Sequence, residues 1–493
     1  MEEFIGQVNS FLWGPWMIYG CLAVGLLFSI LTRFLQVRLV KDMVVQMLKG
    51  EKSDAGVSSF QALAIALSGR VGTGNIAGTA TAIAFGGPGA VFWMWMIAFI
   101  GASSAFVEST LAQIYKVKDQ GQYRGGPAYY IEKGIGLKWY AVIFAIAALL
   151  AMSILMPGIQ SNSIAIGMEN AFGLERWITG AAIVVILGII ILGGVKRIAN
   201  VAQLVVPFMA IAYMLMAIII IGMNITELPG VFKLIFSSAF SFDSTFGGMV
   251  GAAIAWGVKR GVYSNEAGQG TGPHAAAAAE VSHPAKQGLV QAFSVYIDTL
   301  LVCSATAFMI LFTGMYNVQL DDGEGEFVVE NLPGVEAGAG YTQAAIDYAM
   351  PGVGIGAGFV AIALFFFAFT TIMAYYYMAE TNVAYLLKGN AEKIGIFVLK
   401  IVILITAFYG TINEAKLAWA LGDMGLGLMV WLNLIAILII AKPALLALKD
   451  YEAQKKEGKD PVFDPRKLGI KNADFWIEYN DNLNNENHEN LKK

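Results

Sequence analysis

Two short stretches of the sequence place glycine, asparagine and arginine inside long apolar runs. "RVGTGNIAGTAT" begins at Arg70, and "RGVYSNEAGQGT" begins at Arg260. Aligned without gaps, the stretches match at five of twelve positions, namely Arg70/Arg260, Asn75/Asn265, Ala77/Ala267, Gly78/Gly268 and Thr81/Thr271. Because glycine in a helix interior costs up to about 1 kcal/mol relative to alanine, each cluster of glycines favours a local interruption of a helix.

An interrupted helix in an apolar environment leaves peptide groups without partners, which is tolerated only where protein or a watery cavity satisfies them. The N–H groups at the start of a half-helix attract a carboxylate, and the carbonyl groups at the other side of the interruption can hold a cation. An amino-acid zwitterion together with Na⁺ fits both requirements. The alternative is that the glycines only allow close helix packing. That alternative suits an isolated pair of glycines better than a repeated motif that also contains Asn and Arg.

The composition indicates an integral membrane protein. Of the 493 residues, 57% are hydrophobic and 14% are charged, whereas typical soluble domains carry roughly a quarter charged residues. Lysine and arginine are absent from Gln287 through Leu387. The lipid bilayer is therefore the expected surrounding of the chain. The net charge of −4 is too small to argue for a nucleic-acid partner, and we expect none.

The apolar runs predict an all-α polytopic fold, because a spanning helix needs about 20 mostly apolar residues. β-barrel strands are excluded, since these runs are too long and do not alternate. We expect eleven transmembrane helices, near 14–33, 59–84, 88–115, 139–167, 174–193, 199–223, 245–278, 286–314, 352–387, 394–411 and 416–441.

The distribution of basic residues predicts the orientation, because cytoplasmic loops are rich in Lys and Arg. One side of the predicted bundle carries Arg33, Arg38, Lys41, Lys49, Lys52, Lys116, Lys118, Arg124, Lys133, Lys138, Lys196, Arg197, Lys286, Lys388 and Lys393. The other side carries only Arg176, Lys233 and Lys416, and it includes the acidic segment "QLDDGEGEFVVENLPGVE". We therefore expect the N-terminus outside and the polar tail inside the cell.

The two motif-bearing helices run in opposite directions, since five helices separate their starts. Paired glycine-interrupted segments at matching places in two inverted halves indicate the binding site of a transporter. The expected organisation is an extracellular N-terminus at 1–13, an extra helix and cytoplasmic loop at 14–58, a first inverted repeat at 59–223, a second at 245–441, and a cytoplasmic C-terminal tail at 442–493.

Six charged residues fall within the predicted spans, where each charge costs about 2.5–3.5 kcal/mol on insertion scales and function is the default hypothesis. They are Arg70, Glu108, Lys259, Arg260, Glu266 and Asp298. Glu266 is expected either to meet a substrate ammonium or to pair with Arg70 or Arg260. Lys259 and Arg260 are expected to pair with acids. Asp298 is expected either to complete a polar network beneath the site or to lie on a wet helix face.

Uncharged polar residues supply further candidates for binding a small zwitterion. Asn265 and Gln269 can both donate and accept hydrogen bonds. Thr79 lies one turn beyond Asn75 on a similar helix face, so it can contact substrate, or its hydroxyl can only bond back to its own helix.

At these residues the chain resembles the alanine/glycine:cation symporter family, the sodium:alanine symporters. The resemblance rests on "GTGNIAG", on "YRGGPAYYIEKG" at Tyr123–Gly134 and on "GVYSNEAGQGTGPHAAAAA" at Gly261–Ala279, and it covers the chain from about Ser59 to Ile440. This family is similar to transporters of the leucine-transporter (LeuT) fold, which have five-plus-five inverted repeats with broken first and sixth core helices. Here one extra N-terminal helix precedes the ten.

The resemblance also implies roles for particular residues. Gly72–Asn75 match the G-x-G-N motif of that fold, so the amides of Thr73 and Gly74 are expected to bind the substrate carboxylate. The carbonyl groups of Ser68 and Val71, with Thr370 and Thr371 of the eighth core helix, are expected to bind Na⁺. Arg70 stands where the pattern has a small residue, so a second sodium site is not carried over. The predicted substrate-binding set is Thr73, Gly74, Asn75, Thr79, Asn265, Glu266, Gly268 and Gln269.

These observations predict a sodium-coupled symporter of the cell membrane that imports alanine and glycine by alternating access. Na⁺ is the expected coupling ion, no organic cofactor is expected, and a monomer suffices. The alternative within this class is proton coupling, with Glu266 or Asp298 as the carrier. A channel fits less well, because channels usually place rings of identical residues around an oligomeric axis. An enzyme is not expected, because the spans contain no nucleophile–base arrangement or metal ligands.

Overall fold

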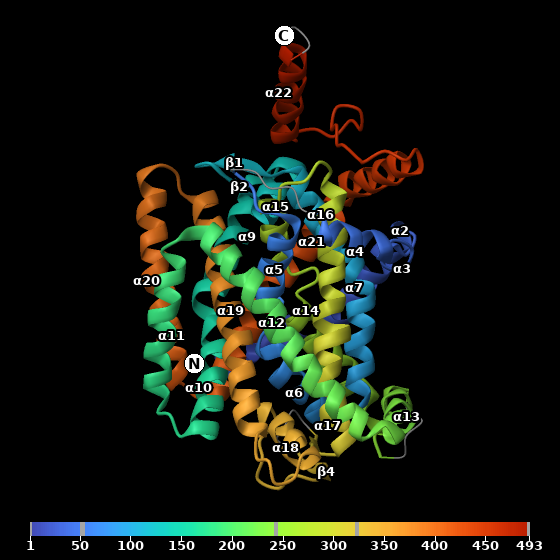
Figure 1. Ribbon diagram of the computed structural model, residues 1–493, viewed down its shortest axis with the longest axis vertical. Coiled ribbons are helices and arrows are strands. Elements are labelled where there is room, and N and C mark those ends of the chain that lie inside the picture. The colour runs from blue at the N-terminus through green and yellow to red at the C-terminus, as the bar shows by residue number, and fades with distance from the viewer. Residues whose placement is uncertain (1, 50–54, 241–244, 321–324, 491–493) are drawn as a thin grey trace.

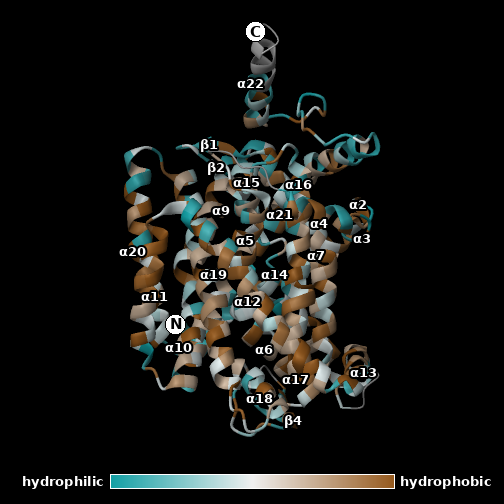
Figure 2. Ribbon diagram, viewed as in Figure 1, coloured by the Kyte–Doolittle hydropathy of each residue, from teal (hydrophilic) through white to brown (hydrophobic). Residues whose placement is uncertain are grey.

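The computed structural model describes residues 2–49, 55–240, 245–320 and 325–490 of the chain. Long helices run side by side in one bundle, with the C-terminal segment projecting at one end and α13, α18 and β4 at the other (Figure 1). Apolar residues predominate along the long helices, whereas hydrophilic residues gather in the C-terminal segment (Figure 2). Lys52 and part of the acidic segment, at 321–324, lie outside the described residues.

The elements are almost all helical. The α-helices are α1 (Glu2–Leu12), α2 (Pro15–Leu31), α3 (Leu35–Arg38), α4 (Val40–Leu48), α5 (Ser59–Arg70), α6 (Thr79–Gly86), α7 (Gly89–Ile114), α8 (Pro127–Tyr130), α9 (Lys138–Leu150), α10 (Pro157–Phe172), α11 (Arg176–Ile191), α12 (Gly194–Met223), α13 (Leu228–Ala239), α14 (Val250–Asn265), α15 (Gly272–Ala278), α16 (Pro284–Val295), α17 (Ser304–Thr313), α18 (Ala339–Ala349), α19 (Gly356–Leu386), α20 (Asn390–Ile412), α21 (Ala415–Lys456) and α22 (Asp474–Asn490). Two small antiparallel hairpins pair β1 (Val117–Asp119) with β2 (Gln122–Arg124) and β3 (Asn317–Gln319) with β4 (Phe327–Glu330).

Within the described residues, eight helices are long and apolar enough to cross a membrane. They confirm the polytopic all-α class. The other expected spans correspond to the shorter helix α11 and to the two interrupted segments α5–α6 and α14–α15. The total of eleven therefore stays a prediction. α21 extends to Lys456, well beyond the expected end near 441. The expected bound marks only the end of the apolar run, whereas the helix itself continues into the polar residues that follow.

Both glycine motifs interrupt their helices, as the sequence predicts. α5 ends at Arg70, Val71 has a non-helical ψ of 88°, and one turn of π-helix at Gly74–Gly78 leads into α6. α14 ends at Asn265, and Glu266, Gly268 and Gly270 then adopt φ values of 55°, 81° and 88°. Glycine adopts this left-handed region without the steric cost that a side chain brings. Local backbone chemistry thus explains where the second helix breaks.

Glycine also governs packing elsewhere in the bundle, most clearly between α14 and α7. A Cβ atom at Gly257 would lie 2.5 Å from the carbonyl oxygen of Ala90 and 2.6 Å from Cβ of Trp93. Gly261 meets Ile97 of α7 in the same way. Small residues at such contacts let two helices approach closely. The interrupted helix therefore rests directly against α7.

The C-terminal segment folds back onto the end of the bundle from which α21 emerges. The Phe463 N–H donates to the Ser282 carbonyl oxygen at 3.0 Å, and Nε1 of Trp476 donates to the Gln113 carbonyl oxygen at 2.7 Å. Trp476 is buried, and Nζ of Lys116 lies 5.1 Å from its ring centroid. Burial there lowers the pKa of Lys116 to about 7. We call residues 457–490 the tail, and this end of the bundle the tail side.

Candidate substrate and ion site

The first interruption lies against the end of α14. A Cβ atom at Gly74 would stand 3.0 Å from Cδ1 of Tyr263 and 3.3 Å from the Cα atom of Ser264. A side chain at position 74 would therefore separate the two segments. The absence of one brings the "GTGN" turn next to the residues that precede the second interruption.

The residues expected to bind Na⁺ converge in part. The Thr371 hydroxyl lies 2.8 Å from the Ser68 carbonyl oxygen and 3.5 Å from that of Val71. The Thr370 hydroxyl instead contacts the carbonyl oxygens of Phe366 and Phe367, both at 3.0 Å, and the sulfur of Met209. Successive residues of an α-helix point about 100° apart, so only one of the two threonines can face the end of α5. The structure brings Ser68, Val71 and Thr371 together but not Thr370.

Asn75 holds the first interruption in shape. Its Oδ1 accepts from the Gly72 N–H at 2.8 Å, and its Nδ2 donates to Oδ1 of Asp298 at 2.6 Å. Asp298 also accepts from Ser264 Oγ at 2.8 Å and from Thr299 Oγ1 at 2.7 Å. Of the two expectations for Asp298, the buried polar network is therefore the observed one.

Gln160 of α10 meets the amide that was expected to bind a substrate carboxylate. Its Oε1 accepts from the Thr73 N–H at 3.0 Å, and its Nε2 donates to the Tyr263 hydroxyl at 3.4 Å. Gln160 was not among the residues expected from the sequence. The available signal was the polar run Gln160–Ser163 within a predicted membrane span.

The second interruption presents buried polar atoms that lack partners. Asn265, Glu266 and Gln269 are all buried. Nδ2 of Asn265, Oε1 of Glu266 and both amide atoms of Gln269 find no hydrogen-bond partner among the described residues. Leaving a buried donor or acceptor unsatisfied costs about 1–3 kcal/mol. A small ligand with a carboxylate and an ammonium group carries the complementary atoms, so this arrangement favours a polar binding site.

The charged residues within the spans take partners that the sequence left open. Arg70 donates to the Gln291 carbonyl oxygen at 3.3 Å and also to Ser294 Oγ, while Glu266 Oε2 accepts from Thr271 Oγ1 at 2.8 Å. In the part of the chain that the structure describes, Glu266 forms no ion pair within 4.0 Å with either Arg70 or Arg260. The two alternatives for Glu266 therefore both stay predictions.

Lys259 and Arg260 share one acid. The sequence predicts that both pair with acids but does not identify which. Asp423 of α21 lies 2.9 Å from Nη1 of Arg260 and 2.7 Å from Nζ of Lys259. The ring centroid of Trp419 lies 4.4 Å from the Arg260 guanidinium carbon and 5.4 Å from the centroid of Tyr263. Because α21 runs from Ala415 towards the tail, this cluster lies on the side of the bundle away from the tail.

Residues 1–465 match the sodium:alanine symporter family. The chain belongs to this family. Among its relatives, the putative sodium/proton-dependent alanine carrier protein YrbD of Bacillus subtilis is 72% identical over 97% of this chain and 98% of the relative. The sodium/proton-dependent alanine carrier protein of Bacillus sp. is 59% identical over 87% and 95%. The sodium/alanine symporter AgcS of Methanococcus maripaludis is 37% identical over 93% and 99%.

Solved structures show the same fold at low identity. MhsT in complex with L-phenylalanine aligns with a TM-score of 0.51 at 14% identity, over 81% of this chain and 99% of MhsT. A Na⁺-coupled sialic acid symporter aligns with a TM-score of 0.52 at 12% identity, over 95% and 96%. Together these findings confirm the family, the LeuT-type fold and a carrier rather than an enzyme.

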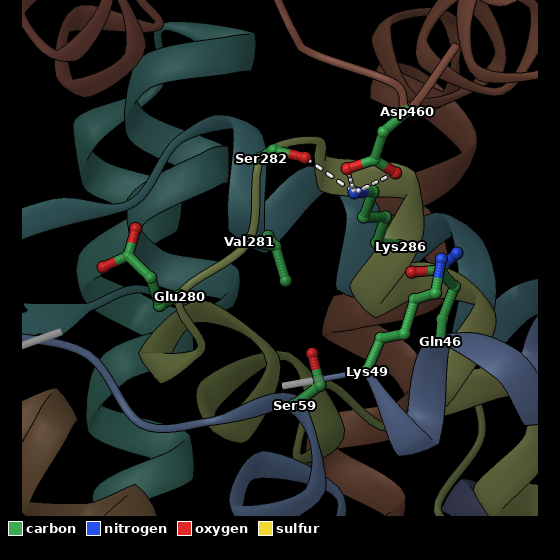
Figure 3. Close-up of a pocket in the computed structure, with 8 residues that line it drawn as sticks. All are labelled: Gln46, Lys49, Ser59, Glu280, Val281, Ser282, Lys286 and Asp460. Carbon is green, nitrogen blue, oxygen red and sulfur yellow. Dashed lines mark hydrogen bonds and ion pairs between the residues drawn. The ribbon is translucent and has the colours of Figure 1, made fainter. Parts of the chain in front are cut away.

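This member of the family also has a cavity of about 280 Å³, lined mainly by polar residues, on its tail side (Figure 3). The cavity lies where both interrupted segments reach that side, between Ser59 at the start of α5 and the loop after α15. Its lining residues are Gln46, Lys49, Ser59, Glu280, Val281, Ser282, Lys286 and Asp460. Nζ of Lys286 contacts Ser282 Oγ at 2.7 Å and Asp460 of the tail at 2.8 Å.

Proposed function

We propose that this sodium:alanine symporter imports alanine and glycine together with Na⁺ by alternating access. The observation that carries the proposal is the meeting of the Thr371 hydroxyl with the carbonyl groups of Ser68 and Val71. Three oxygen atoms from two helices form part of a coordination shell suited to a hard cation. A Na⁺ ion bound there would link the end of α5 to α19. Ion binding would then stabilise the conformation of the interrupted segment that binds substrate.

The substrate binds between the two interruptions. Its carboxylate accepts hydrogen bonds from the N–H groups of Thr73 and Gly74. The substrate carboxylate then replaces Gln160 Oε1 as the acceptor of the Thr73 N–H. The substrate ammonium donates to Oε1 of Glu266. The unpartnered atoms of Asn265 and Gln269 complete the contacts. The close approach of the two segments at Gly74 favours a small substrate.

We place the N-terminus outside the cell membrane and the tail inside, on the distribution of basic residues. Residues 59–223 and 245–441 then form the two inverted halves, each beginning with an interrupted helix. In this orientation the Arg260–Asp423 cluster closes the outer side of the site, and the cavity at Ser59 lies on the cytoplasmic side.

Uptake into proteoliposomes tests the sodium coupling. Labelled alanine should accumulate when a Na⁺ gradient is applied, and unlabelled glycine should compete. An inside-negative potential should increase accumulation, because each charge moved gains about 2.3 kcal/mol per 100 mV. Equal alanine uptake after Na⁺ is replaced with choline would contradict the proposal.

Proton coupling is the second candidate, favoured by the buried carboxylates Glu266 and Asp298 and by two relatives that are named as sodium/proton-dependent alanine carriers. Glu266→Gln removes one titratable group and leaves a side chain of nearly the same size. If protons are carried at Glu266, transport by this variant loses its pH dependence. If transport by the variant keeps both its pH response and its Na⁺ dependence, proton coupling at Glu266 is wrong.

A further inference from the structure

We propose that Glu108 of α7 is a positioning residue of the binding site, whose carboxylate holds the second interruption in its binding conformation. The inference rests on the proposed function, because it deepens the account of the same site. Glu108 is buried, and the sequence analysis left its partner open. It contacts the backbone of Gly268, one of the expected substrate-binding positions, so we infer that it acts through the backbone between α14 and α15.

The carboxylate of Glu108 accepts hydrogen bonds from the unwound backbone at two points. The Gly268 N–H donates to Oε1 at 3.2 Å, and the Gly270 N–H donates to Oε2 at 3.1 Å. Both glycines have φ values in the left-handed region, 81° and 88°. One carboxylate therefore satisfies two amides that no regular helix would satisfy, and it does so from a different helix.

A second helix supports the same contact. Nδ2 of Asn433 in α21 donates to Oε2 of Glu108 at 2.7 Å and to the Gly268 carbonyl oxygen at 2.9 Å. Oδ1 of Asn433 accepts from the Tyr130 hydroxyl. The backbone of Gly268 is thus held at both its N–H and its carbonyl group. This double contact fixes the path of the chain through the interruption.

Gln269 lies between the two amides that Glu108 holds, and both of its own amide atoms lack partners among the described residues. Glu266 and Asn265, just before Gly268, also carry unpartnered atoms. The polar atoms available to a substrate therefore belong to a stretch of chain whose position depends on Glu108. The same bonds keep the substrate carboxylate away from the second interruption, because a resident carboxylate already occupies its amides.

The two oxygens of Glu108 matter because both accept from N–H groups, whereas a glutamine accepts on one atom and donates from the other. In Glu108→Gln, one backbone N–H of the interruption loses its acceptor. The new side-chain NH₂ group would face that N–H, which is also a donor. The interruption should then sample other conformations, and the substrate-binding atoms should be misplaced more often.

The decisive experiment compares Glu108→Gln with Ser109→Ala in proteoliposomes. Ser109 is the next residue of α7, is also buried, and its hydroxyl has no hydrogen-bond partner among the described residues. For Glu108→Gln we expect the KM for alanine to rise about tenfold or more, as expected for losing a hydrogen bond to a charged group. We expect the Na⁺ concentration for half-maximal uptake, measured at saturating alanine, to change less than about twofold, because the expected sodium ligands lie at the first interruption. Ser109→Ala should leave both values unchanged.

Hydrogen–deuterium exchange of the purified proteins gives a readout that does not need transport. The peptide covering 266–272 should exchange faster in Glu108→Gln than in wild type or Ser109→Ala, because its amides lose their acceptor. If Glu108→Gln does not fold, Asn433→Ala keeps the carboxylate and should give a smaller rise in KM and in exchange. Glu108→Asp, which retains the charge, should restore part of the alanine affinity.

A folded Glu108→Gln protein with the KM and the exchange rate of wild type would overturn the inference. A similar rise in KM for Ser109→Ala would also overturn it, since packing of α7 would then be the cause. If wild-type protein takes up no alanine with Na⁺, the proposed function fails, and the exchange comparison still decides the role of Glu108.

Discussion

The hydroxyl groups of Thr370 and Thr371 are adjacent in sequence but contact different parts of the molecule. Both hydroxyls bond back to the Phe367 carbonyl oxygen of α19, but only Thr371 also meets the end of α5 at Ser68, whereas Thr370 touches Met209. At the scale of single residues, this difference predicts unequal roles in Na⁺ binding. Thr371→Ala should raise the Na⁺ concentration for half-maximal alanine uptake by about tenfold, because a ligand to a charge is lost. Thr370→Ala should change it less than about twofold.

A Na⁺ titration of uptake for both variants checks this prediction. Thr371→Ser keeps the hydroxyl and should retain most of the wild-type Na⁺ affinity. A larger effect of Thr370→Ala than of Thr371→Ala would show that the ion does not bind where the Ser68 and Val71 carbonyl groups meet α19.

At the scale of elements, the close contact of α14 with α7 depends on glycine. A Cβ atom at Gly257 would lie 2.5 Å from the Ala90 carbonyl oxygen, so Gly257→Ala should force the helices apart. We expect a loss of about 1–3 kcal/mol in stability, as for other overpacked interiors. Gly251→Ala is the matched control on the same helix, because a Cβ atom there meets nothing within 4 Å. Thermal unfolding in detergent should show a lower Tm for Gly257→Ala only.

Gly251→Ala should be neutral or slightly stabilising, because alanine favours a helix by up to about 1 kcal/mol over glycine. The two substitutions add the same atoms at different places on one helix. Equal Tm values for both variants would therefore mean that the approach of α14 to α7 is looser than the structure indicates.

At the scale of the whole molecule, the tail joins the end of α21 to the loop after α15. Nε2 of His283 contacts Asp450 at 3.2 Å, and its ring packs on Phe463, with Lys286 and Asp460 close by. Burial is the main cause that lowers the pKa of His283. His283 is therefore harder to protonate when the tail is docked, and we expect its ordinary pKa of about 6.5 to return when the tail is released.

This difference in pKa sets the sign of a pH effect. The stabilisation that His283 contributes to docking is fully present above a pH of about 6.5 and is lost as the pH falls below it, because the released state then binds more protons. Limited trypsin digestion of the tail should accordingly be faster at a pH of about 5.5 than at about 7. Carboxyl groups ordinarily have pKa values below this pH range. The contact with His283 lowers the pKa of Asp450 further, so Asp450 adds little to the pH effect between about 5.5 and about 7.

His283→Gln serves as the control for this measurement, because glutamine keeps polar atoms near Asp450 without titrating. The variant should show the same digestion rate at both pH values once trypsin activity is normalised. The pKa of Lys116 is lowered to about 7, so its contribution to tail docking changes with pH mainly above about 7. It therefore has little effect on the comparison of digestion rates at a pH of about 5.5 and of about 7. An unchanged pH response in His283→Gln would assign the effect to another group.

Sequence alone determined the features that depend on local chemistry. Long apolar runs predict the spanning helices because a bilayer leaves few other structures possible, and the glycine clusters at Gly72 and Gly268 predict the interruptions because backbone freedom is a property of the residue. The same motifs carry the resemblance to the family that the comparisons confirm. The full length of α21 and the contact of Gln160 with Thr73 were not predicted, because a polar run can mark a candidate residue but does not say which residue it contacts.

Only the tertiary structure decided which side chains meet. Glu108 holds amides 160 residues away, Arg260 pairs with an acid 163 residues away, and Thr371 rather than Thr370 faces a carbonyl 303 residues away. Such pairings depend on how each helix is rotated and how closely it packs, which a single sequence does not specify. An apolar run places a helix in the membrane, but the contacts between helices decide which of its residues can bind an ion or a substrate.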